Sequence, residues 1–167
     1  MKSALHDKIV TILDRCPDMT IATVRPDGAP QATVVSFVHD GLQIYFGTGR
    51  EAQKALNIER EPRVSVTVTA PYADWQHIEG VSLAGIAGEV TSAQEKALVD
   101  KLMFDRLPQL MDSIEQFQNE TKLFRVRPTL VSVLDYSKGF GHTDLVAVHA
   151  DDLARQKVGQ PRETVKG

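Results

Sequence analysis

The spacing of the hydrophobic positions changes near residue 20, from that of a helix to that of strands. Residues 3–15 carry apolar side chains at helical intervals, which predicts an amphipathic helix that Pro17 ends. Its apolar stripe consists of Leu5, Ile9, Ile12, Leu13 and Cys16. Beyond Pro17 apolar side chains recur at every second residue. This pattern predicts strands at 21–25, 32–38 and 42–46, arranged as a meander with turns at 26–30 and 39–41.

Two strands of the first half differ in their expected burial. Residues 33–38 are apolar on both faces, which predicts a barrel strand that also contacts a ligand or a partner subunit. Residues 63–69 instead alternate between apolar and hydroxyl side chains, with Val64, Val66 and Val68 on one face. That alternation predicts a half-exposed antiparallel strand.

The second half adds two long strands. The first is expected at 78–91, where three glycines indicate bulges or bends of a barrel strand. These glycines are Gly80, Gly85 and Gly88. The other is expected at 122–135, and its apolar face changes at Pro128, which predicts a bulge or an edge because proline cannot donate to a ladder.

A helix is expected between these two strands. Ser92 and Glu95 have the spacing of a capping box, so the helix begins there and extends to about residue 107. Its predicted apolar set is Ala97, Leu98, Leu102 and Met103. A shorter helix is expected at 109–116.

Composition narrows the class of protein. The 167 residues, 42% of them hydrophobic and 25% charged, suit one domain, which we expect at 1–146 with a polar tail at 147–167. A net charge of −3 gives no general attraction for nucleic acid or an anionic membrane. No apolar run reaches membrane-spanning length, and the single cysteine suits a reducing compartment. We therefore expect a cytoplasmic protein with no membrane or nucleic-acid partner.

The densest group of candidate binding residues lies where a strand pattern passes through two glycines into a helix pattern at 50–58. Thr48 and Glu51 have capping-box spacing, which predicts a helix N-terminus with unpaired backbone N–H groups at this point. Arg50 and Lys54 are four residues apart and would extend from one face of that helix, where both could bind a phosphate. A solvated basic face on an ordinary strand–helix connection is the alternative interpretation.

Five segments of the first half follow a family pattern in unbroken order. They are residues 19–24, 26–31, 43–48, 53–58 and 61–66. On these segments the chain resembles the FMN-binding split-barrel family typified by pyridoxamine 5′-phosphate oxidase. Each segment alone is moderately specific, and the ordered series is much more so.

This resemblance implies a mainly β fold, an antiparallel split β-barrel of the FMN-binding type with a few helices. It also implies a homodimer with FMN at the subunit interface. The strand at 32–38 would lie against the flavin ring, and Lys54 matches the family's phosphate-binding lysine. The implied cofactor-binding residues are Gln31, Thr33, Val34, Val35, Thr48, Gly49, Arg50, Gln53 and Lys54.

The chain departs from the family pattern in two places. Many members carry a serine and an arginine directly before the phosphate-binding lysine, where this chain has Ala52 and Gln53. One hydroxyl and one positive charge are therefore missing, and Arg50 could substitute. The arginine and histidine cluster with which the oxidase holds pyridoxamine 5′-phosphate is not recognisable near the C-terminus. Oxidation of that compound is therefore not the expected activity.

The expected function is that of an FMN-dependent oxidoreductase acting on an unidentified small molecule, with its catalytic residues unknown. Two alternatives stay open: a non-catalytic flavin-binding protein involved in stress response or storage, and a relative that binds a deazaflavin or haem. Haem would need an axial ligand such as His142 or His149. The five histidines lack the spacing of metal ligands on one helix face, so no metal site is expected.

Three further features each have two interpretations. Cys16 ends the apolar stripe of the first helix, so core packing is favoured over a catalytic thiolate. Trp75 is favoured as a packing anchor over a clamp on a ligand ring. The glycine-rich loop at 135–142, which contains Lys138 and His142, is either a surface turn or a rim that meets the cofactor or substrate across a dimer interface.

Overall fold

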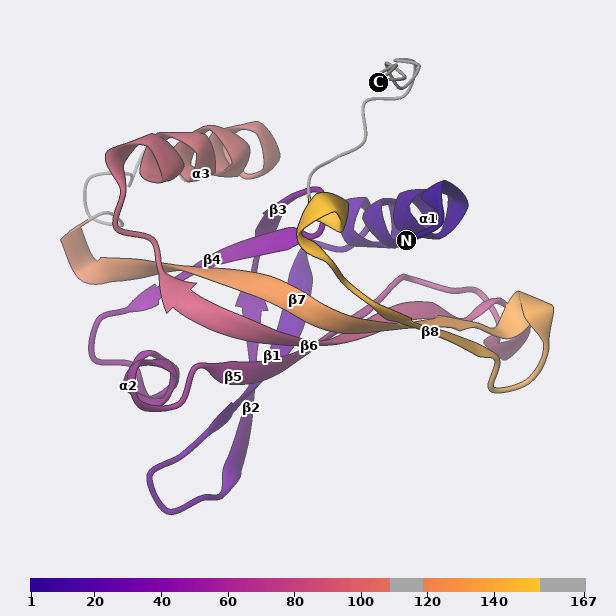
Figure 1. The fold of residues 1–167 in the computed structure, drawn as a ribbon, viewed down its shortest axis with the longest axis horizontal. Helices are drawn as coiled ribbons and strands as arrows, with labels where there is room; N and C mark the ends of the chain where they lie inside the picture. The colour runs from indigo at the N-terminus through magenta and orange to yellow at the C-terminus, as the bar shows by residue number, and fades with distance from the viewer. Residues whose placement is uncertain (109–118, 154–167) are drawn as a thin grey trace, which may run out of the picture.

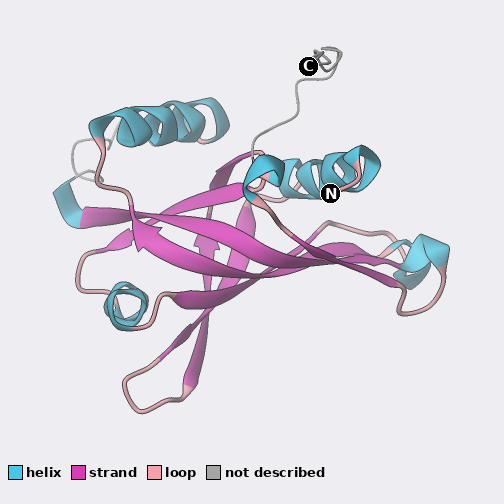
Figure 2. Ribbon diagram, viewed as in Figure 1, coloured by secondary structure: helices cyan, strands magenta, loops and turns pink. Residues whose placement is uncertain are grey.

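One antiparallel sheet of eight strands forms most of the molecule and curls into a half-barrel (Figures 1 and 2). The computed structural model describes residues 1–108 and 119–153. The strands are β1 (Asp18–Val24), β2 (Pro30–Ser36), β3 (Val38–Asp40), β4 (Gln43–Gly49), β5 (Arg63–Thr69), β6 (Glu79–Glu89), β7 (Thr121–Asp135) and β8 (Thr143–Ala147). Their order is β2-β1-β5-β6-β7-β4-β3, with β8 paired to β7. This is the mainly β, antiparallel split barrel that the sequence predicts.

Three α-helices accompany the sheet in the described residues, together with short 3-10 turns. The helices are α1 (Ser3–Asp14), α2 (Gln53–Arg60) and α3 (Ala93–Arg106), and the turns include η1 (Trp75–His77), η3 (Tyr136–Lys138) and η4 (Ala150–Asp152). In Figure 1, α1 and α3 lie above the sheet, and α2 lies at the lower left, beside β5. The predicted helix at 109–116 falls outside the described residues.

The core fills the concave inner face of the sheet. Alternation along β5 buries Val64, Val66 and Val68, as predicted, and exposes the side chains between them. Phe46 of β4 and Phe124 of β7 stack in the centre with ring centroids 5.5 Å apart. The stripe of α1 packs on the same cluster, to which it contributes Ile9, Ile12, Leu13 and Cys16. Burial raises the pKa of the Cys16 thiol, in keeping with a packing role.

The hairpins predicted at 26–30 and 39–41 are confirmed, but the single strand predicted between them, and with it the meander, is wrong. β2 pairs only with β1, and β4 pairs with β3 and β7, so β2 and β4 are not hydrogen-bonded to each other. The segment predicted as one strand at 32–38 divides at Phe37, whose side chain is buried. The chain therefore crosses from one end of the sheet to the other at this residue. β2 is left as an edge strand that faces β4 across the split of the barrel.

The bulge predicted near Pro128 is confirmed. The register between β6 and β7 shifts at Ala84 and Gly85, which pair with Leu130 and Pro128 respectively, so Thr129 is the extra residue. A Cβ on Gly85 would lie 2.7 Å from the carbonyl oxygen of Arg127, so the close approach of the two strands requires glycine.

Helix α3 covers the outer face of β3 and β4. The Ser92 hydroxyl accepts a hydrogen bond from the Glu95 backbone N–H at 3.1 Å, so Ser92 caps the helix as predicted, but the reciprocal bond of a capping box is not among those found. The Glu95 carboxylate accepts hydrogen bonds from Arg125 at 2.7 Å and from the Tyr45 hydroxyl at 3.3 Å. Burial, with the neighbouring Glu95 carboxylate, raises the pKa of Tyr45 to about 12.

The predicted apolar face of this helix is partly wrong. Val99 and Met103 are buried and Leu102 is half-buried, but Ala97 and Leu98 are exposed. The helix turns the Val99 side toward β4, because Glu95 is held by Arg125.

An ion cluster ties α1 to the far ends of β6 and β7. Lys8 forms ion pairs with the buried Asp135 carboxylate and with Glu79, the latter at 3.1 Å. Burial alone would raise the pKa of Asp135, but hydrogen bonds from Lys8 and Ser137 outweigh burial and leave that pKa below its ordinary value. The ionised carboxylate therefore stabilises the fold.

We expect Asp135→Asn to lower the free energy of unfolding by about 1–3 kcal/mol at pH 7. The pKa of Asp135 is lower in the folded chain than in the unfolded chain, so its stabilisation is complete above the unfolded value and disappears as pH falls through the folded value. The difference between wild type and variant should therefore shrink below about pH 4. Urea unfolding at pH 7 and pH 3 measures it, with the exposed Asp27→Asn as the control. A difference that is equal at both pH values contradicts this account.

Candidate functional site

Most of the cofactor-binding residues predicted from sequence surround the split between β2 and β4. β2 contributes Gln31 and Thr33, β4 contributes Thr48, and α2 closes the gap with Gln53, Lys54 and Asn57. We call these six residues the β2–α2 site. They come from three separate elements, so the site exists only in the folded chain.

Asn57 is the polar centre of the β2–α2 site. It is 0% exposed, and its amide nitrogen donates to Thr23 Oγ1 at 2.9 Å and to Gln31 Oε1 at 3.0 Å. Its amide oxygen accepts a hydrogen bond from Gln53 Nε2 at 2.9 Å. A buried amide with all of these partners fixes α2 against β1 and β2.

Two groups in the site have capacity for a ligand. The hydroxyl of Thr33 is buried and has no hydrogen-bond partner among the described residues. Lys54 Nζ donates to Thr48 Oγ1 at 3.3 Å, which places a cation and a hydroxyl side by side. An unpaired buried hydroxyl is costly, so a ligand that bonds to it would gain stability.

The predicted start of α2 is wrong. Thr48 lies in β4, which continues to pair with β7 through Gly49, and the helix begins at Gln53 rather than at Arg50. Thr48 and Glu51 therefore form no capping box. The N-cap residue is Ala52, and no side chain caps this helix. Its first turn consequently offers backbone N–H groups and the positive end of the helix dipole to an anion.

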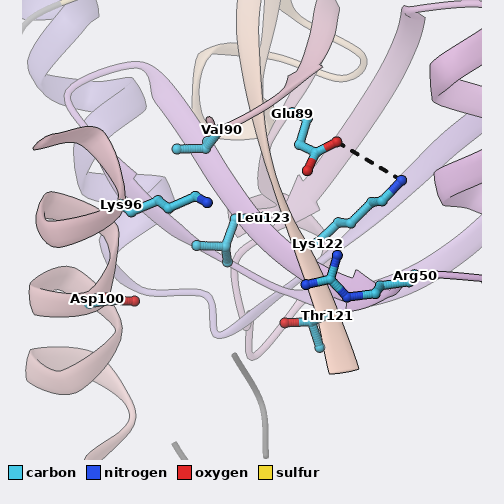
Figure 3. A pocket seen from close by; sticks show the side chains of 8 residues that line it. All are labelled: Arg50, Glu89, Val90, Lys96, Asp100, Thr121, Lys122 and Leu123. Carbon is cyan, nitrogen blue, oxygen red and sulfur yellow. Dashed lines mark ion pairs between the residues drawn. The ribbon is translucent and has the colours of Figure 1, made fainter. Parts of the chain in front are cut away.

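Arg50 does not share a helix face with Lys54. It lies in the turn before α2, and its Nε donates to the carbonyl oxygen of Asn119 at 2.9 Å. Its side chain lines a pocket of about 350 Å³ at the start of β7, together with Lys96, Lys122 and Glu89 (Figure 3). Lys122 is held by ion pairs with Glu59 and, at 4.0 Å, with Glu89. This pocket contains both signs of charge and is formed by elements other than β2.

The side chains of β2 alternate between its two faces, so the cofactor-binding residues predicted on this strand do not all lie on one face. Gln31, Thr33 and Val35 are half-buried and face inward, whereas Val34 faces outward and is 69% exposed. The chain alone therefore does not cover both faces of this strand, although its sequence is apolar on both. Val34 therefore lies on the opposite face of β2 from Gln31 and Thr33. Gly49 is exposed at the end of β4.

The aromatic residues of the two far turns form a surface cluster. Trp75 packs against another side chain, as predicted, but it does so on the surface, where it is 55% exposed. Its ring meets the edge of Phe140 at a centroid distance of 5.9 Å, and Tyr136 meets Phe140 at 5.5 Å. Lys138 and His142 of the same loop pair with Asp144 at 2.8 and 3.4 Å. We call Trp75, Tyr136 and Phe140 the aromatic turn.

Sequence reasoning missed the role of Asn57 and Thr23. Asn57 stands four residues after Gln53, and a pair of amides at that spacing on one helix face is a signal that could have indicated a polar network. Thr23 faces inward near the end of β1, where the other inward side chains, Met19 and Ile21, are apolar. Neither observation identifies Gln31 as a partner, because that requires knowing that β2 pairs with β1.

Neither a metal site nor a membrane span is found in the described part of the chain. No group of three or more His, Cys, Asp or Glu side chains there could hold a metal ion. Of the helices within residues 1–108 and 119–153, none has the length and apolar character needed to cross a membrane.

Comparison with known proteins gives one family match and several similar structures. Residues 5–135 match the family described as pyridoxamine 5′-phosphate oxidase. General stress protein 26 of Bacillus subtilis (strain 168) is 29% identical over 108 residues, which are 65% of this chain and 74% of that protein.

Two of the similar solved structures are haem proteins by name. The haem-binding protein from Mycobacterium smegmatis has a TM-score of 0.74 and 21% identity over 88% of this chain. The present chain spans 59% of the length of that protein. The haem storage protein from Vibrio cholerae has a TM-score of 0.62 and 22% identity over 73% of this chain and 88% of its own. At these identities the likeness is one of fold.

Proposed function

The chain belongs to the pyridoxamine 5′-phosphate oxidase family, and from this membership we propose that it is an FMN-dependent oxidoreductase acting on a small molecule. The observation that carries the proposal is the β2–α2 site, in which a buried hydroxyl with no partner among the described residues, a lysine beside a threonine, and an uncapped helix N-terminus come from elements that border the split. These groups fit the two ends of FMN, a ring with polar edges and a phosphate.

Lys54 and the start of α2 would hold the phosphate. The Lys54 ammonium and the Thr48 hydroxyl are already within hydrogen-bonding distance of each other, so a phosphate oxygen between them could bond to both. The uncapped first turn of α2 adds backbone N–H donors. Lys54 is only partly exposed, and partial burial strengthens its attraction for an anion.

The inward residues of β2 would hold the ring. The Thr33 hydroxyl would find a partner in a ring oxygen or nitrogen, and Gln31, fixed by Asn57, would present its amide at the same edge. Because β2 is an edge strand, its main chain also has groups that no other strand pairs. When bound, FMN supplies the transfer of electrons or hydride, and the protein supplies placement and electrostatics.

The substrate we propose is a small molecule other than pyridoxamine 5′-phosphate. Gln53 stands where many family members carry an arginine, and in this chain it bonds to Asn57, so it adds no positive charge for a second phosphate. We further propose that residues 1–146 act as the flavin-binding domain and that 147–167 form a tail. The single cysteine, buried at position 16, suits the cytoplasm.

We also propose that the chain acts as a homodimer with the cofactor at the subunit interface. The support is local: β2 borders the site, its outer edge is unpaired within the described chain, and its Val34 side chain is exposed to solvent. A second subunit on this strand would cover the apolar residues that the first leaves open.

Binding of FMN and of riboflavin to the purified chain tests the phosphate assignment. The two ligands share the ring and differ in the phosphate, so we expect FMN to bind about tenfold to a hundredfold more tightly. Equal affinities would contradict the assignment. Anaerobic addition of NADH or NADPH to the complex then tests the reaction, because loss of the oxidised flavin absorption identifies an electron donor.

Haem is the second candidate, favoured by the two haem proteins among the similar structures. No histidine belongs to the β2–α2 site as described, so haem would need a ligand from elsewhere, such as His142 in the loop before β8. Addition of haem to wild type and to His142→Ala, followed by absorption spectroscopy, tests whether the chain binds haem through His142. A Soret band that the substitution removes supports haem, and bound FMN in the same preparation opposes it.

Two more hypotheses concern which group is bound and what it does there. A deazaflavin would be released from the purified protein as a fluorophore whose mass differs from that of FMN. A non-catalytic flavin protein, such as one acting in stress, would bind FMN that no donor reduces. The similarity to a general stress protein supports the second of these.

A further inference from the structure

We propose that the pocket at the start of β7 is a second binding site, which takes a small organic molecule with a single carboxylate group and an apolar body. We call it the β7 pocket. None of the residues that line it belongs to the β2–α2 site, so this inference does not depend on the binding of FMN.

Separate parts of the chain enclose the β7 pocket. Helix α3 lines one side with Lys96 and Asp100, which are four residues apart and therefore share a face of the helix. The other side is formed by Arg50, in the turn before α2, and by the first residues of β7 (Figure 3). The volume of about 350 Å³ lies near the lower end of the range for small-molecule sites, so the pocket suits a compact ligand.

One wall of the β7 pocket is apolar and fixed. It consists of Val90, which is buried, and Leu123, which is half-buried, and both belong to the apolar cluster beneath α3. The Val90 backbone N–H donates to the carbonyl oxygen of Leu123 at 2.8 Å, which holds the two residues together. A ligand with an apolar body would gain by covering this wall.

Arg50 is held in place before any ligand binds. Its backbone N–H donates to the carbonyl oxygen of Glu120 at 3.2 Å, and its Nε donates to that of Asn119 at 2.9 Å. The two terminal nitrogens have no partner within residues 1–108 and 119–153, and Figure 3 shows the guanidinium directed into the pocket. The planar fork of a guanidinium matches a carboxylate, and a fork that is already positioned loses less freedom on binding.

Lys96 supplies a second cation from the opposite side. It forms no hydrogen bond or ion pair within the part of the chain that the structure describes. In Figure 3 its ammonium points away from α3 and toward Leu123, into the space that Arg50 also faces. A carboxylate between the two would therefore bond to a cation on each side.

The acidic side chains limit the charge of the ligand. Lys122 is already paired with Glu59 and Glu89, and the hydrogen bond with Glu59 raises the pKa of this lysine. Glu89 and Asp100 place negative charges on the lining of the pocket. One carboxylate of a ligand can reach the two cations described above, whereas a second would meet one of these acidic groups. The pocket therefore selects a monoanion.

Fluorine NMR titrations of the purified full chain test the ligand class, with 4-fluorobenzoate as the probe. We expect saturable binding of this monoanion. Two probes with the same ring and no negative charge, 4-fluorobenzamide and 4-fluorobenzylamine, should bind at least about tenfold more weakly. So should 4-fluorophthalate, which has two carboxylates, and trifluoroacetate, which has no ring. The inference is overturned if 4-fluorobenzoate does not bind, or if any of the other four probes binds equally well.

Substitutions and competition test the place of binding. Arg50→Ala and Lys96→Ala should each raise the dissociation constant for 4-fluorobenzoate about fivefold or more. The matched control is Lys101→Ala, which removes an exposed lysine of the same helix outside the pocket and should leave the constant unchanged. Thermal unfolding of each variant confirms that the fold is retained.

Neither FMN nor inorganic phosphate, at a concentration equal to that of the probe, should displace 4-fluorobenzoate. Displacement by FMN would place the probe in the β2–α2 site, and displacement by phosphate would show a site for phosphate rather than for a carboxylate on an apolar body. Either result overturns the inference, as does binding that both Arg50→Ala and Lys96→Ala leave unchanged. A chain that binds 4-fluorobenzoate as expected but no FMN leaves the inference standing and refutes the FMN proposal alone.

Discussion

Replacement of Lys54 by alanine is expected to raise the dissociation constant for FMN about tenfold to a hundredfold. The substitution removes one charge-assisted hydrogen bond to a phosphate, worth about 1.5–3 kcal/mol. In the structure the ammonium lies 3.3 Å from the Thr48 hydroxyl at the uncapped start of α2, where it would be available to the phosphate. Titration of the cofactor-free protein, followed by flavin fluorescence, measures the change.

The fold should survive this change, because alanine is a good helix former and Lys54 has no ion pair among the described residues. Riboflavin, which lacks the phosphate, should bind the variant and wild type equally. Lys54→Arg keeps the positive charge and should retain most of the affinity for FMN. Lys101→Ala removes a lysine from the exposed side of α3 and should leave that affinity unchanged. Equal FMN affinity in Lys54→Ala and wild type would contradict the phosphate assignment.

Replacement of Asn57 by leucine is expected to lower the free energy of unfolding by roughly 2–4 kcal/mol. Leucine has a similar volume but no polar group, so Thr23 and Gln31 would lose the donor at 2.9 and 3.0 Å, and Gln53 its acceptor. Asn57 is 0% exposed, so water cannot replace the lost hydrogen bonds. Urea unfolding measures the loss.

FMN binding should weaken in the same variant, because Gln31 is no longer held in place. The matched control is Gln94→Leu, which removes an exposed amide near the start of α3 and should change stability by less than about 0.5 kcal/mol. Stability equal to wild type in Asn57→Leu would show that the polar network does not fix α2 to the sheet.

Local patterns predicted the elements well and their order poorly. The alternation of β5 gave its bounds at Arg63–Thr69, and the stripe of α1 gave most of its buried residues but not His6 and Val10, because each pattern depends on neighbours in sequence. The pairing of β4 with β7 depends on residues about 80 positions apart in the chain, and no local spacing records it. We expected a meander because consecutive strands usually pair with each other. The chain instead ends β2 at Ser36 and begins β3 at Val38, on the other side of Phe37.

The same distinction between local patterns and long-range pairing explains which site residues could be predicted. Lys54, Thr48, Gln31 and Thr33 were predicted from a family resemblance, and the fold brings them to one gap. Arg50 was added on the assumption that the helix began there, but pairing of β4 with β7 extends the strand to Gly49 and outweighs the capping-box spacing. Asn57 was missed because its spacing from Gln53 indicates no further partner until the strand order places Gln31 and Thr23 beside it.

The absorption spectrum of the purified full chain, with mass analysis of whatever it releases on denaturation, tests the central claim most directly. We predict the two bands of oxidised flavin and the mass of FMN. A colourless protein that also fails to take up added FMN, or one that releases haem or a deazaflavin instead, would contradict the claim.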